Sequence, residues 1–110
     1  MDAKTLRALK QSIEKWERNA VAETPVGYTT GAASCALCRL FWMEGCGDCP
    51  VMERTGLRGC SGTPHDEATA AGSRWRGYPS DAALRDDAHA AARAEAEFLR
   101  SLLPEEEATP

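Results

Sequence analysis

The feature that most constrains this chain is the spacing of its five cysteines. Two Cys-x2-Cys pairs fall within fifteen residues, and the fifth cysteine comes after ten more; the five are Cys35, Cys38, Cys46, Cys49 and Cys60. Two thiolates separated by two residues can both face one tetrahedral zinc ion, and two further thiolates complete its ligands. The spacing therefore predicts a closed, structural zinc site that uses four of the five cysteines.

The residues leave other uses of these cysteines open. The thiols could be buried as small apolar groups, be joined in disulfides, or hold an iron–sulfur cluster, although the spacing matches neither usual ferredoxin pattern. His65 follows Cys60 after four intervening residues and could be an alternative ligand. Because cysteine already over-supplies the site, an exposed loop histidine is the favoured interpretation of His65.

A metal would also answer a stability problem posed by the composition. The 110 residues correspond to one domain, expected over residues 1–110, and alanine, which buries little area, supplies much of the apolar content. Small domains with modest cores commonly rely on a metal, disulfides or an oligomer. The segment 45–79 contains seven glycines and three prolines. Little regular secondary structure is therefore expected there, and the metal is expected to hold residues 24–79 together.

Two amphipathic helices are expected on either side of this segment. In residues 1–23 an apolar stripe recurs at helical spacing, made of Leu6, Leu9, Ile13, Trp16 and Ala20. In residues 80–104 a second stripe, ended by Pro104, contains Leu84, Ala88, Ala91, Glu95, Phe98, Leu99, Leu102 and Leu103. A short helix is expected from Cys35 to about Met43. The predicted fold is mainly α: the two helices pack antiparallel, the zinc-stapled middle segment lies across one end, and residues 105–110 form an acidic tail.

Charge restricts the partners of such a chain. The net charge is -4, with +2 in residues 1–20 and -5 in residues 80–110. Bulk nucleic-acid binding is therefore disfavoured, and the acidic end suits solvent or a basic protein partner. No apolar run approaches the length of a membrane helix, and the amino terminus lacks a signal-peptide pattern. We expect no membrane contact and a cytoplasmic location, with a homodimer if the helix pair leaves apolar surface uncovered.

Catalytic motifs are not recognisable in the sequence. Ser34 and Ser61 lie in no nucleophile-elbow pattern, and there is no Gly-x-x-x-x-Gly-Lys phosphate loop. Four thiolate ligands would also leave zinc no open position for a substrate. The sequence therefore predicts a protein that is not an enzyme.

The order of motifs resembles a group of small cysteine-rich proteins encoded by tailed bacteriophages and prophages. The resemblance spans nearly the whole chain, although His65 stands where that group commonly has an aromatic residue. The matching motifs are Ile13-Glu14-Lys15-Trp16, Cys35-x2-Cys38, Cys46-x2-Cys49-Pro50-Val51, Cys60-x-Gly62-Thr63-Pro64 and Glu97-Phe98-Leu99-Arg100-Ser101-Leu102-Leu103-Pro104. The resemblance implies metal binding and action in the cytoplasm of a bacterial host.

These observations give three hypotheses for function, of which the third is a bare folding module with an unneeded metal or a redox-sensing set of cysteines. The first is a phage-type zinc-binding protein that inhibits or modulates a host protein complex by stoichiometric binding, with anti-CRISPR or other counter-defence activity as the specific expectation. The second is a zinc-containing nucleic-acid accessory protein. Its phosphate and stacking contacts would come from Lys4, Arg7, Lys10, Lys15, Arg18, Arg74, Trp75 and Arg76.

Overall fold

The amino-terminal stripe forms helix α1, Ala3–Asn19, in a computed structural model that describes residues 1–31, 34–41, 49–57, 60 and 62–108. Asp2 caps the helix, because its carboxylate accepts a hydrogen bond of 2.7 Å from the Thr5 N–H. Of the predicted stripe, Leu6 is half-buried; four members are buried, namely Leu9, Ile13, Trp16 and Ala20. The expected first helix and its buried face are confirmed.

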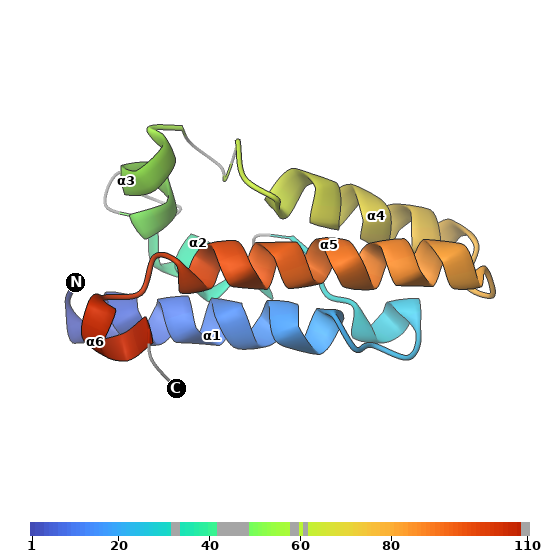
Figure 1. The fold of residues 1–110 in the computed structure, drawn as a ribbon, viewed down its shortest axis with the longest axis horizontal. Helices are drawn as coiled ribbons and strands as arrows, with labels where there is room; N and C mark the ends of the chain where they lie inside the picture. The colour runs from blue at the N-terminus through green and yellow to red at the C-terminus, as the bar shows by residue number, and fades with distance from the viewer. Residues whose placement is uncertain (32–33, 42–48, 58–59, 61, 109–110) are drawn as a thin grey trace.

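The second expected helix is α5, Ala82–Arg100, capped by Asp81. Figure 1 shows α5 running antiparallel to α1 along its length. Arg100 and Glu17 join the two helices by an ion pair. The face that α5 buries is narrow because it is largely alanine, which lets the backbones approach closely; its members include Ala88, Ala92, Ala96 and Leu99. The mainly helical fold and the antiparallel pair are therefore as predicted.

A further helix, α4 (His65–Gly77), corrects the expectation of little regular secondary structure in residues 45–79. It packs along α5 on the side away from α1 (Figure 1). Its buried face consists of small residues and one large anchor, Ala68, Ala71, Gly72 and Trp75. A β-carbon on Gly72 would collide with the Tyr28 ring. This glycine therefore serves close packing inside a helix, whereas its presence in the sequence suggests a turn.

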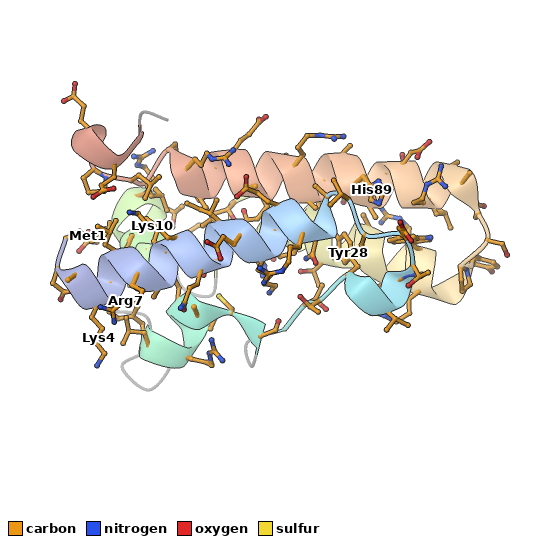
Figure 2. All side chains as sticks on the ribbon, turned by 90° about the horizontal axis from the view of Figure 1, so that it is seen from below. Met1, Lys4, Arg7, Lys10, Tyr28 and His89 are labelled. Carbon is orange, nitrogen blue, oxygen red and sulfur yellow. The ribbon has the colours of Figure 1, made fainter. Side chains whose placement is uncertain are left out.

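Tyr28 lies between the three long helices and connects them (Figure 2). Its hydroxyl donates to the carbonyls of Ala68 at 2.7 Å and Ala88 at 3.3 Å, which belong to α4 and α5. Its ring meets Trp16 and Trp75 edge-on, at centroid distances of 5.9 and 6.2 Å. Burial raises the pKa of the Tyr28 hydroxyl, which keeps it protonated as a donor.

His89 on α5 extends this row of rings. It is half-buried and meets Trp75 edge-on at 5.5 Å. Its Nε2 lies 2.7 Å from the Ala22 carbonyl, so it also secures the loop after α1. The charged residues near it on α5, Asp86, Asp87 and Arg93, are exposed.

Short helices complete the described part of the chain. They are η1 (Pro25–Gly27), α2 (Ala36–Phe41), α3 (Pro50–Thr55) and α6 (Glu105–Ala108). Helix α2 agrees with the predicted short helix over its described residues. Helix α6 lies within the expected acidic tail, and its Glu107 pairs with Lys10 of α1 at 2.8 Å. Within the described residues, no helix has the length and apolar run needed to cross a bilayer.

Candidate functional site: a cysteine-lined pocket

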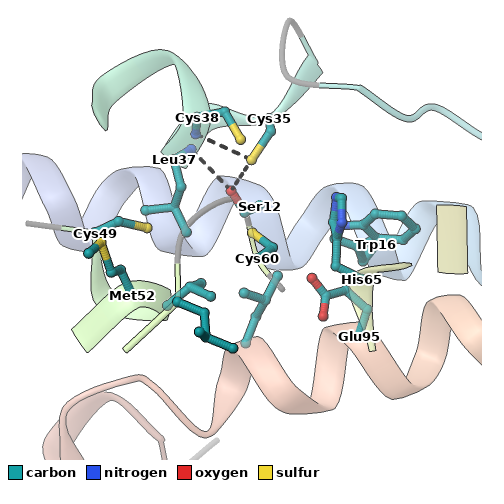
Figure 3. A pocket seen from close by; sticks show the side chains of 13 residues that line it. Ser12, Trp16, Cys35, Leu37, Cys38, Cys49, Met52, Cys60, His65 and Glu95 are labelled. Carbon is teal, nitrogen blue, oxygen red and sulfur yellow. Dashed lines mark hydrogen bonds between the residues drawn. The ribbon is translucent and has the colours of Figure 1, made fainter. Parts of the chain in front are cut away.

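A pocket of about 210 Å³ lies between α1, α2, α3 and the carboxyl-terminal half of α5. Figure 3 shows the cysteines that line it together with a histidine and a carboxylate. Three separate segments contribute the four cysteines, which are Cys35, Cys38, Cys49 and Cys60. The remainder of the wall is largely apolar, with Leu37, Val51 and Leu99 among its members.

Cys35 and Cys38 lie side by side in the pocket wall and are joined by a hydrogen bond. Cys35 immediately precedes α2, and its Sγ accepts a hydrogen bond of 3.4 Å from the Cys38 N–H. The Ser12 Oγ of α1 lies 3.9 Å from the same sulfur, within hydrogen-bond range. This Oγ also accepts a hydrogen bond of 3.4 Å from the Leu37 N–H. The Cys38 thiol hydrogen bond, helped by the Cys38 N–H, Lys15 and Ser12, lowers the pKa of Cys35 to about 5 despite burial. Cys35 is therefore set up as a thiolate, the form that binds metals.

Cys60 reaches the pocket from a strained turn. Its φ of 64° is left-handed, a conformation that costs a residue with a side chain of order 1 kcal/mol or more. The turn is supported by Thr63, whose hydroxyl donates to the Cys60 carbonyl at 2.7 Å and accepts from the His65 N–H at 3.1 Å. Gly62, at φ 76°, lets the chain turn directly into α4. The backbone is bent in a way that carries the Cys60 side chain toward the pocket (Figure 3).

Two buried charged groups accompany the thiols. Lys15 is 3% exposed and Glu95 is 2% exposed, and neither Lys15 Nζ nor Glu95 Oε1 has a hydrogen-bond partner. Burial lowers the pKa of Lys15, whereas the nearby thiolates and Glu95 act to raise it. Burial, together with the Cys35 thiolate, raises the pKa of Glu95 to about 8. The pocket wall thus combines a thiol that ionises readily, Cys35, with a carboxyl group that resists ionisation, Glu95.

His65 is neither in a loop nor exposed, contrary to expectation. It is the first residue of α4, its side chain is 21% exposed, and it lines the pocket. The ring meets Trp16 edge-on at 5.8 Å, so it occupies an aromatic packing position. Its Nδ1 is buried without a hydrogen bond, 3.8 Å from Asp66.

The structure brings together four of the five predicted ligands, and Cys46 lies outside the described residues. No disulfide joins any two of the four described cysteines. Cys35 and Cys38 lie together, whereas Cys49 stands beside Met52 on another wall (Figure 3). In the described ranges, no three Cys, His, Asp or Glu side chains are already close enough to hold a metal ion. The thiol donor set suits zinc, and metal binding would require these side chains to converge.

Sequence reasoning missed the polar residues that surround the thiols. Ser12 and Lys15 lie beside the apolar stripe of α1, where polar residues are ordinarily taken for solvent-facing ones. Glu95 did carry a signal, because it falls directly on the apolar stripe of α5. A carboxylate at such a position predicts either burial beside a polar group or a break in the stripe.

Comparisons with known proteins return no relatives. No protein-family model, no curated protein and no solved structure matches the chain.

Proposed function

We propose that the chain is a small zinc-binding protein that acts by stoichiometric contact with another protein. The observation that carries the zinc proposal is that Cys35, Cys38, Cys49 and Cys60 line one pocket from three separate segments. Zinc held there would tie α2, α3 and the turn before α4 to one point. Four thiolates complete a tetrahedral site, so the metal would serve structure rather than catalysis.

Helix α3 is the element that would gain most stability from a bound metal. This helix has only six residues, far fewer than a helix needs to be stable by itself. It presents Val51 to the pocket, and Arg54 donates to the Ser101 carbonyl at 3.1 Å. A metal bound by cysteines on both sides of α3 would fix its position, and much of the binding free energy would become folding free energy.

The partner in this proposal is a protein complex of a bacterial host, and inhibition of a CRISPR-type defence complex is the specific hypothesis. Its support is the size of the chain, the acidic carboxyl-terminal helix, and the resemblance to small phage proteins noted above. A pre-ordered scaffold would bind such a partner with little loss of conformational entropy. Acidic residues exposed on α5 would favour a basic surface on the partner; they include Asp86, Asp87 and Glu97.

Metal analysis of the purified protein tests the zinc proposal directly. We expect one zinc per chain by elemental analysis and by native mass spectrometry. The double variant Cys35→Ser/Cys38→Ser leaves three cysteines and should lose the metal, with new protease cuts within residues 49–57. Arg39→Ser is a matched control, because Arg39 is exposed on the same helix α2. A wild-type protein that contains no metal and takes up none when zinc is added would contradict the proposal.

A specific surface favours a second candidate function, nucleic-acid binding. A groove between α1 and α2 is lined by Lys4, Arg7, Gln11 and Arg39. None of its three cations forms an ion pair with a described residue. Figure 2 shows Lys4 and Arg7 on the side of α1 where α2 lies. The surface differs from the predicted one, since Trp75 is fully buried and Lys15 is 97% buried, so neither can contact nucleic acid.

Salt dependence of oligonucleotide binding distinguishes this candidate from the first. If the three groove cations each contact a phosphate of a single strand, log K should fall with log salt at a slope of about -2. Lys4→Gln/Arg7→Gln should flatten the slope, whereas Lys10→Gln, whose lysine pairs with Glu107, should leave it unchanged. Fluorescence anisotropy of a labelled oligonucleotide measures these values. Absence of binding at low salt would eliminate nucleic acid as the partner.

A further inference from the structure

Glu95 is a buried carboxyl group whose Oε1 has no hydrogen-bond partner among the described residues. It lies on the buried face of α5, is 2% exposed, and lines the cysteine-lined pocket. Most buried polar atoms are hydrogen-bonded, because an oxygen that loses water without gaining a partner costs free energy. An unpartnered carboxyl oxygen in the wall of a pocket therefore indicates a hydrogen-bond donor that enters from outside the chain.

The end of the pocket around Glu95 is lined by rings. Figure 3 shows Glu95, His65 and Trp16 at this end, whereas Cys49 and Met52 lie at the other. Trp16 is 1% exposed, and its ring meets that of His65 edge-on at 5.8 Å. Aromatic rings attract further rings in edge-on or offset arrangements, and a methionine thioether also makes favourable contacts with a ring. The walls therefore favour a flat aromatic molecule over a branched aliphatic one.

The pocket has room for such a molecule. Its volume is about 210 Å³, whereas an apolar cavity of about 150 Å³ is enough to bind benzene. Leu57, which is 49% exposed, lines the same pocket as the fully buried Val51 and Glu95. The pocket thus extends from an exposed leucine to a buried carboxyl group. Apolar walls with a few fixed polar groups are typical of small-molecule sites.

We propose that this end of the pocket binds a small, uncharged aromatic molecule with one hydrogen-bond donor, of the phenol class, and that Glu95 Oε1 accepts its hydrogen bond. An uncharged molecule is favoured because a charge would lose its water beside a largely apolar wall. A carboxyl group can accept a hydrogen bond in its ionised and in its protonated form. The binding uses Glu95 and Trp16 rather than the cysteine sulfurs, so it goes beyond the proposed function and needs no metal.

Binding of phenol and of fluorobenzene to the full-length, reduced protein tests this assignment. The two molecules have similar shapes, but only phenol donates a hydrogen bond. A pocket without a buried acceptor would favour fluorobenzene, because phenol gives up hydrogen bonds to water on entry. We expect phenol instead to bind about 10-fold more tightly, the effect of one hydrogen bond to an otherwise unpartnered group.

NMR titration gives both dissociation constants and locates the bound molecule. The indole N–H signal of Trp16 should shift as phenol is added. The signal of Trp75 should not, because Trp75 belongs to α4 and does not line the pocket.

Glu95→Leu removes the acceptor and keeps an apolar side chain in its place. This variant should bind phenol no more tightly than fluorobenzene, without losing affinity for fluorobenzene. Glu97→Leu is the matched control, since Glu97 is exposed on the same helix α5. It should keep the wild-type preference for phenol.

Three results would overturn the inference: no binding of phenol, equal affinity for the two molecules, or a preference for phenol that persists in Glu95→Leu. Should Glu95→Leu fail to fold, the wild-type preference and the Trp16 and Trp75 signals decide. The zinc content of the same wild-type sample, measured separately, tests the proposed function, so that failure of one proposal is distinguished from failure of the other.

Discussion

Trp75→Ala is expected to lower the free energy of unfolding by about 3 to 5 kcal/mol, the usual cost of deleting a buried tryptophan. Trp75 is fully buried and is the one large side chain on the inner face of α4. Its ring meets Tyr28 and His89 edge-on, and its Nε1–H donates to the Pro79 carbonyl at 3.2 Å. Alanine would remove all these contacts, and the small residues around it cannot refill the space.

Urea unfolding followed by circular dichroism measures this loss. Tyr78→Ala is the matched control, because Tyr78 is a nearby aromatic residue that is 70% exposed. Its replacement should change the free energy of unfolding by no more than about 0.5 kcal/mol. Equal effects of the two substitutions would contradict the packing of α4 against Tyr28 and α5.

The second large effect is expected from Glu95→Gln, and it depends on pH. In the folded protein the pKa of Glu95 is raised from 4.5 to about 8, with burial as the main cause. Between these values the folded state keeps a proton that the unfolded state has released. Stability from this group is therefore full at low pH and is lost as the pH rises toward 8. Glutamine does not ionise. The free energy of unfolding of the variant should therefore rise relative to that of the wild type as the pH increases from 4.5 to about 8, by on the order of a few kcal/mol at pH 8.

Cys35 acts in the opposite direction over an overlapping range. Its pKa is lowered from 9.0 to about 5, so its contribution is lost as the pH falls toward 5. The two effects partly cancel in the pH dependence of wild-type stability. The quantity to measure is therefore the difference in the free energy of unfolding between Glu95→Gln and the wild type. Urea unfolding of chelator-treated, reduced protein gives that difference. Glu97→Gln, an exposed position on α5, is the control. A constant difference between Glu95→Gln and wild type would contradict the burial of Glu95.

The local sequence pattern was sufficient to predict the helices α1 and α5. The stripe containing Leu9, Ile13 and Trp16 fixes one buried face of α1 whatever it packs against, and Asp2 and Asp81 begin helices through contacts three residues away. Helix α4 escaped prediction because its buried face is mostly alanine and glycine. Such a face carries almost no hydrophobic signal, and Gly72 is needed only because the Tyr28 ring lies against it.

The candidate site shows the same division. Cysteine spacing by itself determined that a cluster was to be expected, since a Cys-x2-Cys pair orients two thiols within one turn of chain. Only the tertiary structure decided that the fifth cysteine, Cys60, lines the same pocket as Glu95, and that Lys15 and Glu95 are both buried. A side chain's polarity is a property of sequence, but its access to water depends on which helices lie across it. Lys15 and Glu95 belong to α1 and α5, which pack together although they come from opposite ends of the chain.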